Sequence, residues 1–215
     1  MDLITVNRVS FSGIVNVGAT DAITERLQNT SCEFALGRVY IADSDLGGGG
    51  WALSWIVGGV LEPDQGVITR NGVLYEAQQR RQDAWCVRRS IATEIPGKKP
   101  TVRTQIQYGL ATVADQYMRS ETEVIEKFHL TPERYNRPLA SLSKEAWRAS
   151  CAIGLVNGRR IFCFPYLDVD FVETNYKLWL RDLIDLLREA GALIVIPTRM
   201  TAISTSLCDE VVPIA

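Results

Sequence analysis

A run of four glycines followed by a tryptophan is the part of this 215-residue chain whose chemistry is easiest to state. An apolar stretch typical of a buried strand (Arg38 to Ala42) precedes it, and one typical of a buried helix (Trp51 to Val60) follows. Backbone N–H groups at such a turn and at a helix N-terminus attract anions. The sequence therefore predicts a loop with the form of a phosphate-binding loop. Its residues are Gly47, Gly48, Gly49, Gly50 and Trp51.

The charged residues of such a loop are missing. A loop that binds a nucleoside triphosphate has the pattern G-x-x-x-x-G-K-[ST]. Aligned with it, Ser44 takes the first glycine, Gly49 the last, Gly50 the lysine and Trp51 the hydroxyl residue. Gly50 offers no charge to the phosphates, and Trp51 offers bulk where a Mg²⁺-bound hydroxyl is needed. We expect a vestigial loop, with no bound ATP, Mg²⁺ or other metal as cofactor.

Composition excludes several classes of protein. The net charge of −2 argues against a nucleic-acid-binding surface over the whole molecule. Five scattered cysteines without C-x-x-C spacing indicate reduced, mostly buried thiols and no zinc site. No apolar run reaches the roughly 18 residues of a membrane span, and Met1-Asp2-Leu3 does not resemble a signal peptide.

The order of the expected elements predicts an α/β fold. We expect a mostly parallel core sheet, an antiparallel β part and a helical insert, in one domain (1–215) with a helical subdomain at about 101–142. Ligands of such sheets lie beyond the carboxyl ends of the strands, which places the glycine loop, Pro165-Tyr166 and Arg199 on one edge. Residues 78–100 are polar and basic and end in a loop at 96–100.

Alternation of side chains predicts a strand at 3–11, and the other expected strands are 32–36, 38–42, 67–69, 73–75, 160–164, 192–197 and 211–214. Asn71-Gly72, between two of these strands, indicates a hairpin. The expected helices are 51–60, 143–156, 173–190 and 200–207, and the stretch 101–142 is expected to be helical with a break at Thr131-Pro132.

Several short segments resemble the nucleotide-binding domain, or ATPase subunit, of ABC transporters, which has a P-loop NTPase-like fold. The strongest match is Gly58 to Ile68, which is similar to the family's A-G pair followed by L-x-P-D-x-G-x-I. Thr101-Val102-Arg103 resembles the T-V-R-E-x-L helix start. Leu142-Ser143 resembles the start of the LSGGQ signature, and Leu207 to Val211 the segment after the switch histidine. The resemblance covers essentially the whole chain.

The same resemblance implies that the catalytic positions are degenerate. The Walker B carboxylates align with Pro165 and Tyr166, and the switch histidine aligns with Arg199. Ser143, Lys144 and Glu145 stand at the signature, where they are either an ordinary helix cap or a contact to a partner chain. Arg88 and Arg89 follow a strand expected near Trp85–Val87 and stand at the Q-loop, where they are either solvated or in contact with a permease.

The resemblance therefore implies a catalytically degenerate ABC-ATPase-like subunit, a pseudo-ATPase, of an exporter-like transporter. Its partners would be a second, active ATPase-like chain and a membrane permease, which would hold it at the cytoplasmic side of the membrane. Trp51, Ser143, Lys144 and Tyr166 would face the second chain. The alternative is a stand-alone interaction protein that reused the fold.

Overall fold

Two compact units make up the chain. A computed structural model describes residues 2–16, 22–88, 100–114 and 117–214. The first unit combines Met1–Cys86 with Ile161–Ala215, and the second is Val87–Arg160. The helical stretch predicted at about 101–142 lies inside the second unit.

An antiparallel sheet opens the first unit. Its strands are β1 (Leu3–Asn16), β2 (Ala22–Ala35), β4 (Gln65–Arg70) and β5 (Val73–Leu74), in the order β2-β1-β4-β5. The predicted strand 3–11 is the first part of β1, and the predicted strand 32–36 is largely the end of the much longer β2. The predicted hairpin between β4 and β5 is confirmed: Asn71 and Gly72 have φ of 52° and 80°, as a tight two-residue turn requires.

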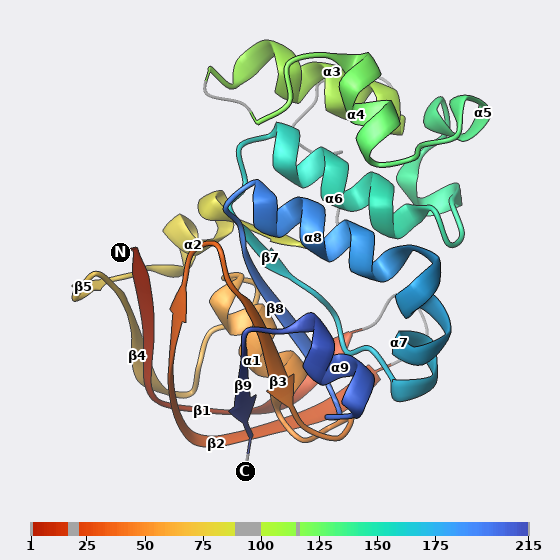
Figure 1. Cartoon of the computed structure of the whole chain (residues 1–215). Coiled ribbons are helices and arrows are strands. Elements are labelled where there is room, and N and C mark those ends of the chain that lie inside the picture. Colours follow the sequence, from red (N-terminus) through yellow and green to blue (C-terminus); the bar gives the residue numbers. More distant parts are fainter. Residues whose placement is uncertain (1, 17–21, 89–99, 115–116, 215) are drawn as a thin grey trace. The chain divides into compact units, whose positions relative to one another are not determined.

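A five-stranded parallel sheet forms the centre of the same unit. Its order is β6-β7-β8-β3-β9, and each neighbouring pair is parallel (Figure 1). This confirms the predicted parallel core. Cys86 and Cys163 pair in register across β6 and β7 as buried free thiols. The strands are β3 (Val39–Asp43), β6 (Ala84–Cys86), β7 (Ile161–Cys163), β8 (Leu193–Thr198) and β9 (Glu210–Pro213).

Helix α1 (Gly50–Val57) contacts both sheets, β2 on one side and β3, β7 and β8 on the other. All of its residues except Trp55 are buried, which explains why it is apolar all round. The strand expected near Trp85–Val87 is confirmed as β6, whereas helix α2, at the start of the polar stretch 78–100, was not predicted. The Gln79 side chain accepts a hydrogen bond from the Glu76 N–H at 3.2 Å and so begins that helix. The other helical elements of this unit are α2 (Ala77–Asp83), α7 (Val169–Asn175), the π-helical η2 (Tyr176–Leu180), α8 (Arg181–Glu189) and α9 (Ala202–Leu207).

The described part of the second unit is helical. The predicted break at Thr131-Pro132 is present, since Pro132 begins α5. Helix α6 begins at Ala146 with Glu145 as its N-cap, whereas Ser143 was expected to cap it. Among the described residues no helix is long and apolar enough to cross a membrane. The elements are α3 (Val102–Thr112), α4 (Glu121–Lys127), α5 (Pro132–Tyr135), η1 (Leu139–Ser141) and α6 (Ala146–Val156).

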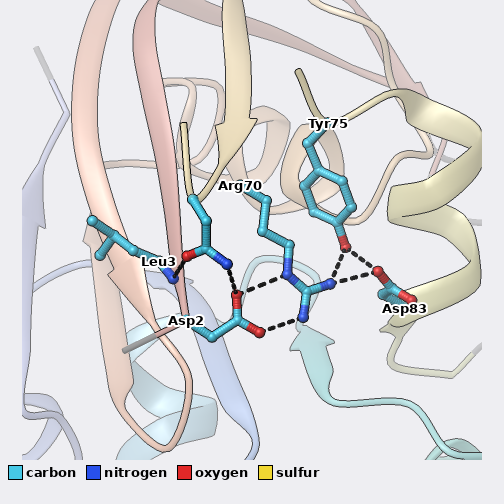
Figure 2. A network of polar contacts seen from close by, with 6 residues as sticks. Asp2, Leu3, Arg70, Tyr75 and Asp83 are labelled. Atoms are coloured by element: carbon cyan, nitrogen blue, oxygen red, sulfur yellow. Dashed lines mark hydrogen bonds and ion pairs between the residues drawn. The ribbon is translucent and has the colours of Figure 1, made fainter. Parts of the chain in front are cut away.

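A polar network ties the start of β1 to the β4–β5 hairpin and to α2 (Figure 2). The Arg70 guanidinium binds both oxygens of Asp2, with Nε at 2.8 Å from Oδ1, and its Nη1 lies 2.7 Å from Oδ2 of Asp83. The Tyr75 hydroxyl donates to the same Asp83 oxygen at 2.6 Å. The hydrogen bonds from Arg70 hold the pKa of the Asp2 carboxyl below its ordinary value.

We predict that Asp2→Asn lowers the free energy of unfolding by about 1–2 kcal/mol at neutral pH, because charge-assisted bonds to Arg70 are lost. Since folding depresses this pKa, the contribution is present above about pH 4 and is lost as the pH falls through the folded value. Urea unfolding at about pH 7 and about pH 3 measures it. The difference in unfolding free energy between wild type and Asp2→Asn shrinks in acid. The control Asp170→Asn, at an exposed position, shows no such difference from wild type. A gap of equal size at both pH values would contradict the prediction.

Candidate functional site

The glycine loop connects β3 to α1 at the carboxyl edge of the parallel sheet. Gly49 precedes the helix with φ of 96°, a left-handed conformation that favours glycine. The Gly48 N–H donates to the Asp45 carbonyl at 2.9 Å, and the Gly50 N–H donates to Ser44 Oγ at 3.1 Å. The strand–loop–helix context predicted from the sequence is therefore present. The N–H groups of Gly47 and Gly49 point toward β2 instead.

The acceptor for the N–H groups of Gly47, Gly49 and Ala52 is the carboxylate of Glu25, near the start of β2. Its Oε1 accepts from the Gly47 N–H at 2.8 Å, and its Oε2 accepts from the Gly49 N–H at 3.0 Å and the Ala52 N–H at 3.2 Å. The exposed fraction of Glu25 is 0%. A buried anion thus lies at the helix N-terminus, where backbone N–H groups and the helix dipole stabilise negative charge.

The backbone of β2 lies directly against the loop. The Arg26 N–H donates to the Gly47 carbonyl at 3.1 Å. A Cβ added to Gly49 would lie 2.5 Å from the Arg26 carbonyl oxygen and 2.9 Å from Leu27 Cα, closer than real Cβ atoms approach. Gly49 is therefore required twice, for its conformation and for this close approach.

Sequence reasoning missed Glu25, although the pattern of β2 contained a signal. Side chains two apart on a strand share a face. Ile23, Glu25 and Leu27 share one, and Leu27 is 1% exposed. A carboxylate on the apolar face of a strand needs a hydrogen-bond partner from another element, because burying it without one is costly.

The residues at the vestigial lysine and hydroxyl positions are both buried. A Cβ on Gly50 would lie 2.3 Å from Ser44 Oγ, so the loop leaves no room for a longer side chain there. Trp51 is 3% exposed and packs edge-on against Trp55, with ring centroids 5.3 Å apart. The expectation that Trp51 faces a partner chain was wrong, because its indole belongs to the core.

The strand ends bring the other predicted positions of this unit to the same edge. Pro165 and Tyr166 follow β7 and Phe164, the residue just after that strand, whose carbonyl accepts from Ser54 Oγ at 2.8 Å. Burial raises the pKa of Tyr166, and the nearby Asp45 carboxylate adds to the effect. Arg199 follows β8, is exposed, and lies 3.2 Å from Asp45 across the loop.

The signature-like residues belong to the second unit and divide by exposure. Ser143 and Lys144 are exposed. Glu145 is 2% exposed and accepts from the Thr131 N–H at 2.6 Å and from its hydroxyl at 2.9 Å, with Arg134 Nη1 at 3.3 Å. The expected partner contact at Glu145 is therefore not supported, because its carboxylate already accepts hydrogen bonds from Thr131 in its own unit.

Arg88 is exposed and has a defined local environment. Its N–H donates to Ser150 Oγ at 2.6 Å, and its guanidinium lies 5.4 Å from the centre of the Trp147 ring. Arg89, the second predicted permease contact, lies outside the described residues. In the part of the chain that the structure describes, no group of three or more His, Cys, Asp or Glu residues could hold a metal ion.

Comparison with known proteins gives matches in structure only. No protein-family model and no curated protein matches the chain. A putative ABC transporter ATP-binding protein from Pyrococcus furiosus has a TM-score of 0.66 at 18% identity, over 99% of this chain and 97% of that one. The cbiO1 protein from Clostridium perfringens, part of the ABC transporter complex cbiONQ, has a TM-score of 0.64 at 18% identity, over 98% and 84%. A bacterial ABC transporter cassette solved as a dimer has a TM-score of 0.66 at 18% identity, over 98% and 94%.

These similarities show the fold. The chain has the α/β fold of ABC transporter ATP-binding domains, with a parallel five-stranded sheet, an antiparallel β part and helices. The fold that the sequence predicts is therefore confirmed over nearly the whole chain.

We predict that Gly49→Ala destabilises the protein by about 2–5 kcal/mol, because a left-handed alanine costs about 1–2 kcal/mol and the clash with β2 adds to it. The matched control is Gly37→Ala. Gly37 also has positive φ, 77°, but nothing lies within 4 Å of its added Cβ, so only the conformational cost applies. Urea unfolding of both variants measures the difference. Equal losses would contradict the close packing of β2 on the loop.

Proposed function

We propose that the chain is a non-hydrolytic ABC-ATPase-like subunit of a membrane transporter, exporter-like in organisation, with a structural or regulatory role. The observation that carries the proposal is the occupied loop. The N–H groups of Gly47, Gly49 and Ala52, which would face a phosphate in a working site, already bind the Glu25 carboxylate.

Charge supports the same proposal. A triphosphate needs cationic groups to offset its negative charge, and Gly50 supplies none. A phosphate brought within about 4 Å of the Glu25 carboxylate would be repelled by about 4 kcal/mol per unit charge at an effective dielectric constant of about 20. That energy corresponds to roughly a thousandfold loss of affinity. We therefore propose that the chain holds neither ATP nor Mg²⁺ as a cofactor.

The remaining catalytic positions also lack the groups that hydrolysis needs. Pro165 and Tyr166 provide no carboxylate at the end of β7. Asp168, the next acidic residue, caps α7 by accepting from the Phe171 N–H at 2.7 Å. Arg199 carries an ion pair where a histidine would stand in the family, and it cannot accept a proton. These contacts favour a role through partners.

Exposed apolar residues at the carboxyl edge suggest where a second ATPase-like chain would bind. Leu46 is 50% exposed and Met200 is 45% exposed. Their neighbours Asp45 and Arg199 are joined by the ion pair at 3.2 Å, so the two apolar side chains belong to one region of the first unit. One similar cassette has a dimeric structure, and cbiO1 is part of a transporter complex. By analogy we propose an active ATPase chain and a permease as partners, with this chain held at the cytoplasmic side of the membrane by the permease.

We predict that neither the wild type nor the Gly50→Lys/Trp51→Ser double variant hydrolyses ATP, in a phosphate-release assay with Mg²⁺. Restoring the two loop residues leaves the strand ends without a catalytic carboxylate. The variant is also destabilised by about 3–5 kcal/mol, because removal of the buried Trp51 ring leaves a cavity. Turnover above background in purified wild type, abolished by Tyr166→Ala, would overturn the proposal.

We predict that Leu46→Asp/Met200→Asp weakens recovery of the active ATPase chain from solubilised membranes by at least about tenfold, because a charge enters an apolar contact. Arg88→Glu weakens recovery of the permease. Val73→Asp, at a site 70% exposed on the edge strand β5, is the matched control and leaves both recoveries unchanged. Mass spectrometry of the captured complex identifies the partners, and circular dichroism verifies folding. If folded wild type brings down neither a permease nor an ATPase chain, the stand-alone interaction protein becomes the better interpretation.

A further inference from the structure

Two buried thiols lie side by side at the edge of the parallel sheet. Cys86 is the last residue of β6 and Cys163 is the last residue of β7, and the two pair in register. Neighbouring strands lie about 4.8 Å apart, and residues paired in register point to the same face of the sheet. The Cα atoms of a disulfide are separated by roughly 4.4–6.8 Å. The backbone at this pair therefore has the spacing that a disulfide requires.

The two sulfur atoms converge on the C-terminal end of α1. A Cβ added to Gly58 would lie 2.8 Å from Cys86 Sγ and 3.3 Å from Cys163 Sγ. Gly58 has φ of −72°, which any residue adopts, so its missing side chain matters for space alone. A hydrogen bond between the two thiols and their burial raise the pKa of Cys163. The sulfurs are thus in contact, in a space that a larger residue at position 58 would fill.

We propose that Cys86 and Cys163 are a cross-linking site, at which a hydroperoxide oxidises the two thiols to a disulfide. The site lies in the first unit and includes none of the catalytic positions discussed above. The inference goes beyond the proposed function and does not depend on it.

The reaction takes two steps. The Cys86 thiolate attacks one oxygen of hydrogen peroxide, so that an S–O bond forms, the O–O bond breaks and hydroxide leaves. The Cys163 thiolate then attacks the Cys86 sulfur, so that the S–S bond forms, the S–O bond breaks and a second hydroxide leaves. The two protons from the thiols convert both hydroxides to water. The sulfurs lose the two electrons that the peroxide gains.

The position of β6 gives the oxidant a way in. This strand has three residues, and among the described strands it pairs with β7 alone, at the edge of the sheet. Short segments at an edge open at a lower free energy than central strands. Cys86 is 5% exposed and Cys163 is 0% exposed, so the sulfur on the edge strand meets the oxidant first.

The cross-link would enclose the whole second unit in one covalent loop. The chain enters that unit directly after Cys86 and leaves it at Arg160, directly before β7. The two strands that carry these connections are the two that the disulfide joins. A disulfide that closes a long loop restricts the unfolded chain, and so stabilises the folded one.

Ordinary core thiols predict a different behaviour. A thiol buried in apolar surroundings does not react with oxidants while the protein stays folded. A pair that reacts through opening of β6 becomes linked under native conditions. Formation of the link in the folded protein is therefore the property that separates the two.

The test is treatment of reduced, folded wild type with enough hydrogen peroxide to oxidise the partly exposed Cys32 and Cys208. Remaining thiols are then alkylated and the protein is digested with trypsin, which places Cys86 in peptide 82–88 and Cys163 in peptide 161–177. We expect mass spectrometry to find these two peptides joined, with the loss of two hydrogens, and separated again by dithiothreitol. We expect the unfolding temperature of the linked protein to exceed that of the reduced protein by roughly 5–15 °C.

Two variants serve as controls. Cys151→Ala removes an equally buried thiol from the second unit, and we expect the same linked peptides and the same rise as in wild type. Cys163→Ala removes one member of the pair, and we expect it to lose both the link and the rise. The digest of wild type decides the matter even if Cys163→Ala does not fold.

Three results would overturn the inference. Peptides 82–88 and 161–177 stay unlinked while Cys32 and Cys208 are oxidised, or they become linked only in urea, after the fold is lost. The third is a linked protein that unfolds at the same temperature as the reduced one, because a disulfide that fits the native spacing adds stability. None of these results bears on ATP hydrolysis, so the non-hydrolytic subunit stands or falls separately.

Discussion

The hydrogen bonds between the Glu25 carboxylate and the loop are the contact on which the first unit depends. An unpaired buried carboxylate would cost several kcal/mol, and each buried N–H left without an acceptor would cost about 1–3 kcal/mol. In this chain the Glu25 carboxylate and the three buried N–H groups satisfy each other's hydrogen bonds. Because the carboxylate comes from β2 and the donors come from the loop before α1, the same contact joins the antiparallel sheet to the helix that covers the parallel sheet.

Neighbouring residues of the same chain form the other hydrogen bonds of the loop and an ion pair beside it. Ser44 Oγ accepts from the Gly50 N–H, and Asp45 offers its carbonyl to Gly48 and its carboxylate to Arg199. Trp51 and Trp55 pack edge to face behind the loop and fill that space with apolar surface. The loop thus keeps the backbone of an anion site while its side chains serve packing. This combination is the basis of the proposed non-hydrolytic role.

Much of the fold followed from the sequence because it depends on local patterns. Alternation predicted the start of β1, and Asn71-Gly72 predicted the β4–β5 hairpin. Continuous apolar runs predicted β3 and β8 in a parallel core, and the resemblance to ABC ATPase domains supplied the topology that such runs leave open. Gly158, with φ of 75°, ends α6 as a glycine stop predicts.

The functional details followed less well because they depend on contacts between distant residues. Glu25 looks like any solvated glutamate until its partners at Gly47 and Gly49 are known. Glu145 was assigned to a surface although its carboxylate binds Thr131 and Arg134 in its own unit. Trp51 was assigned both to a buried helix and to an interface, and its exposed fraction of 3% decides for the core. In each case a tertiary contact decides the role of the side chain.

The anion in the loop is the Glu25 side chain, and this covalent attachment to the chain changes how the loop responds to its surroundings. A free ligand occupies a site in proportion to its concentration, whereas a tethered one has an effective concentration that the fold sets once. The Glu25 carboxylate is held by β2 at bonding distance from the loop, so its occupancy does not rise or fall with metabolite levels. In an assembly whose other members cycle with their ligands, a loop filled in this way would remain constant and serve as a stationary point against which their movements occur.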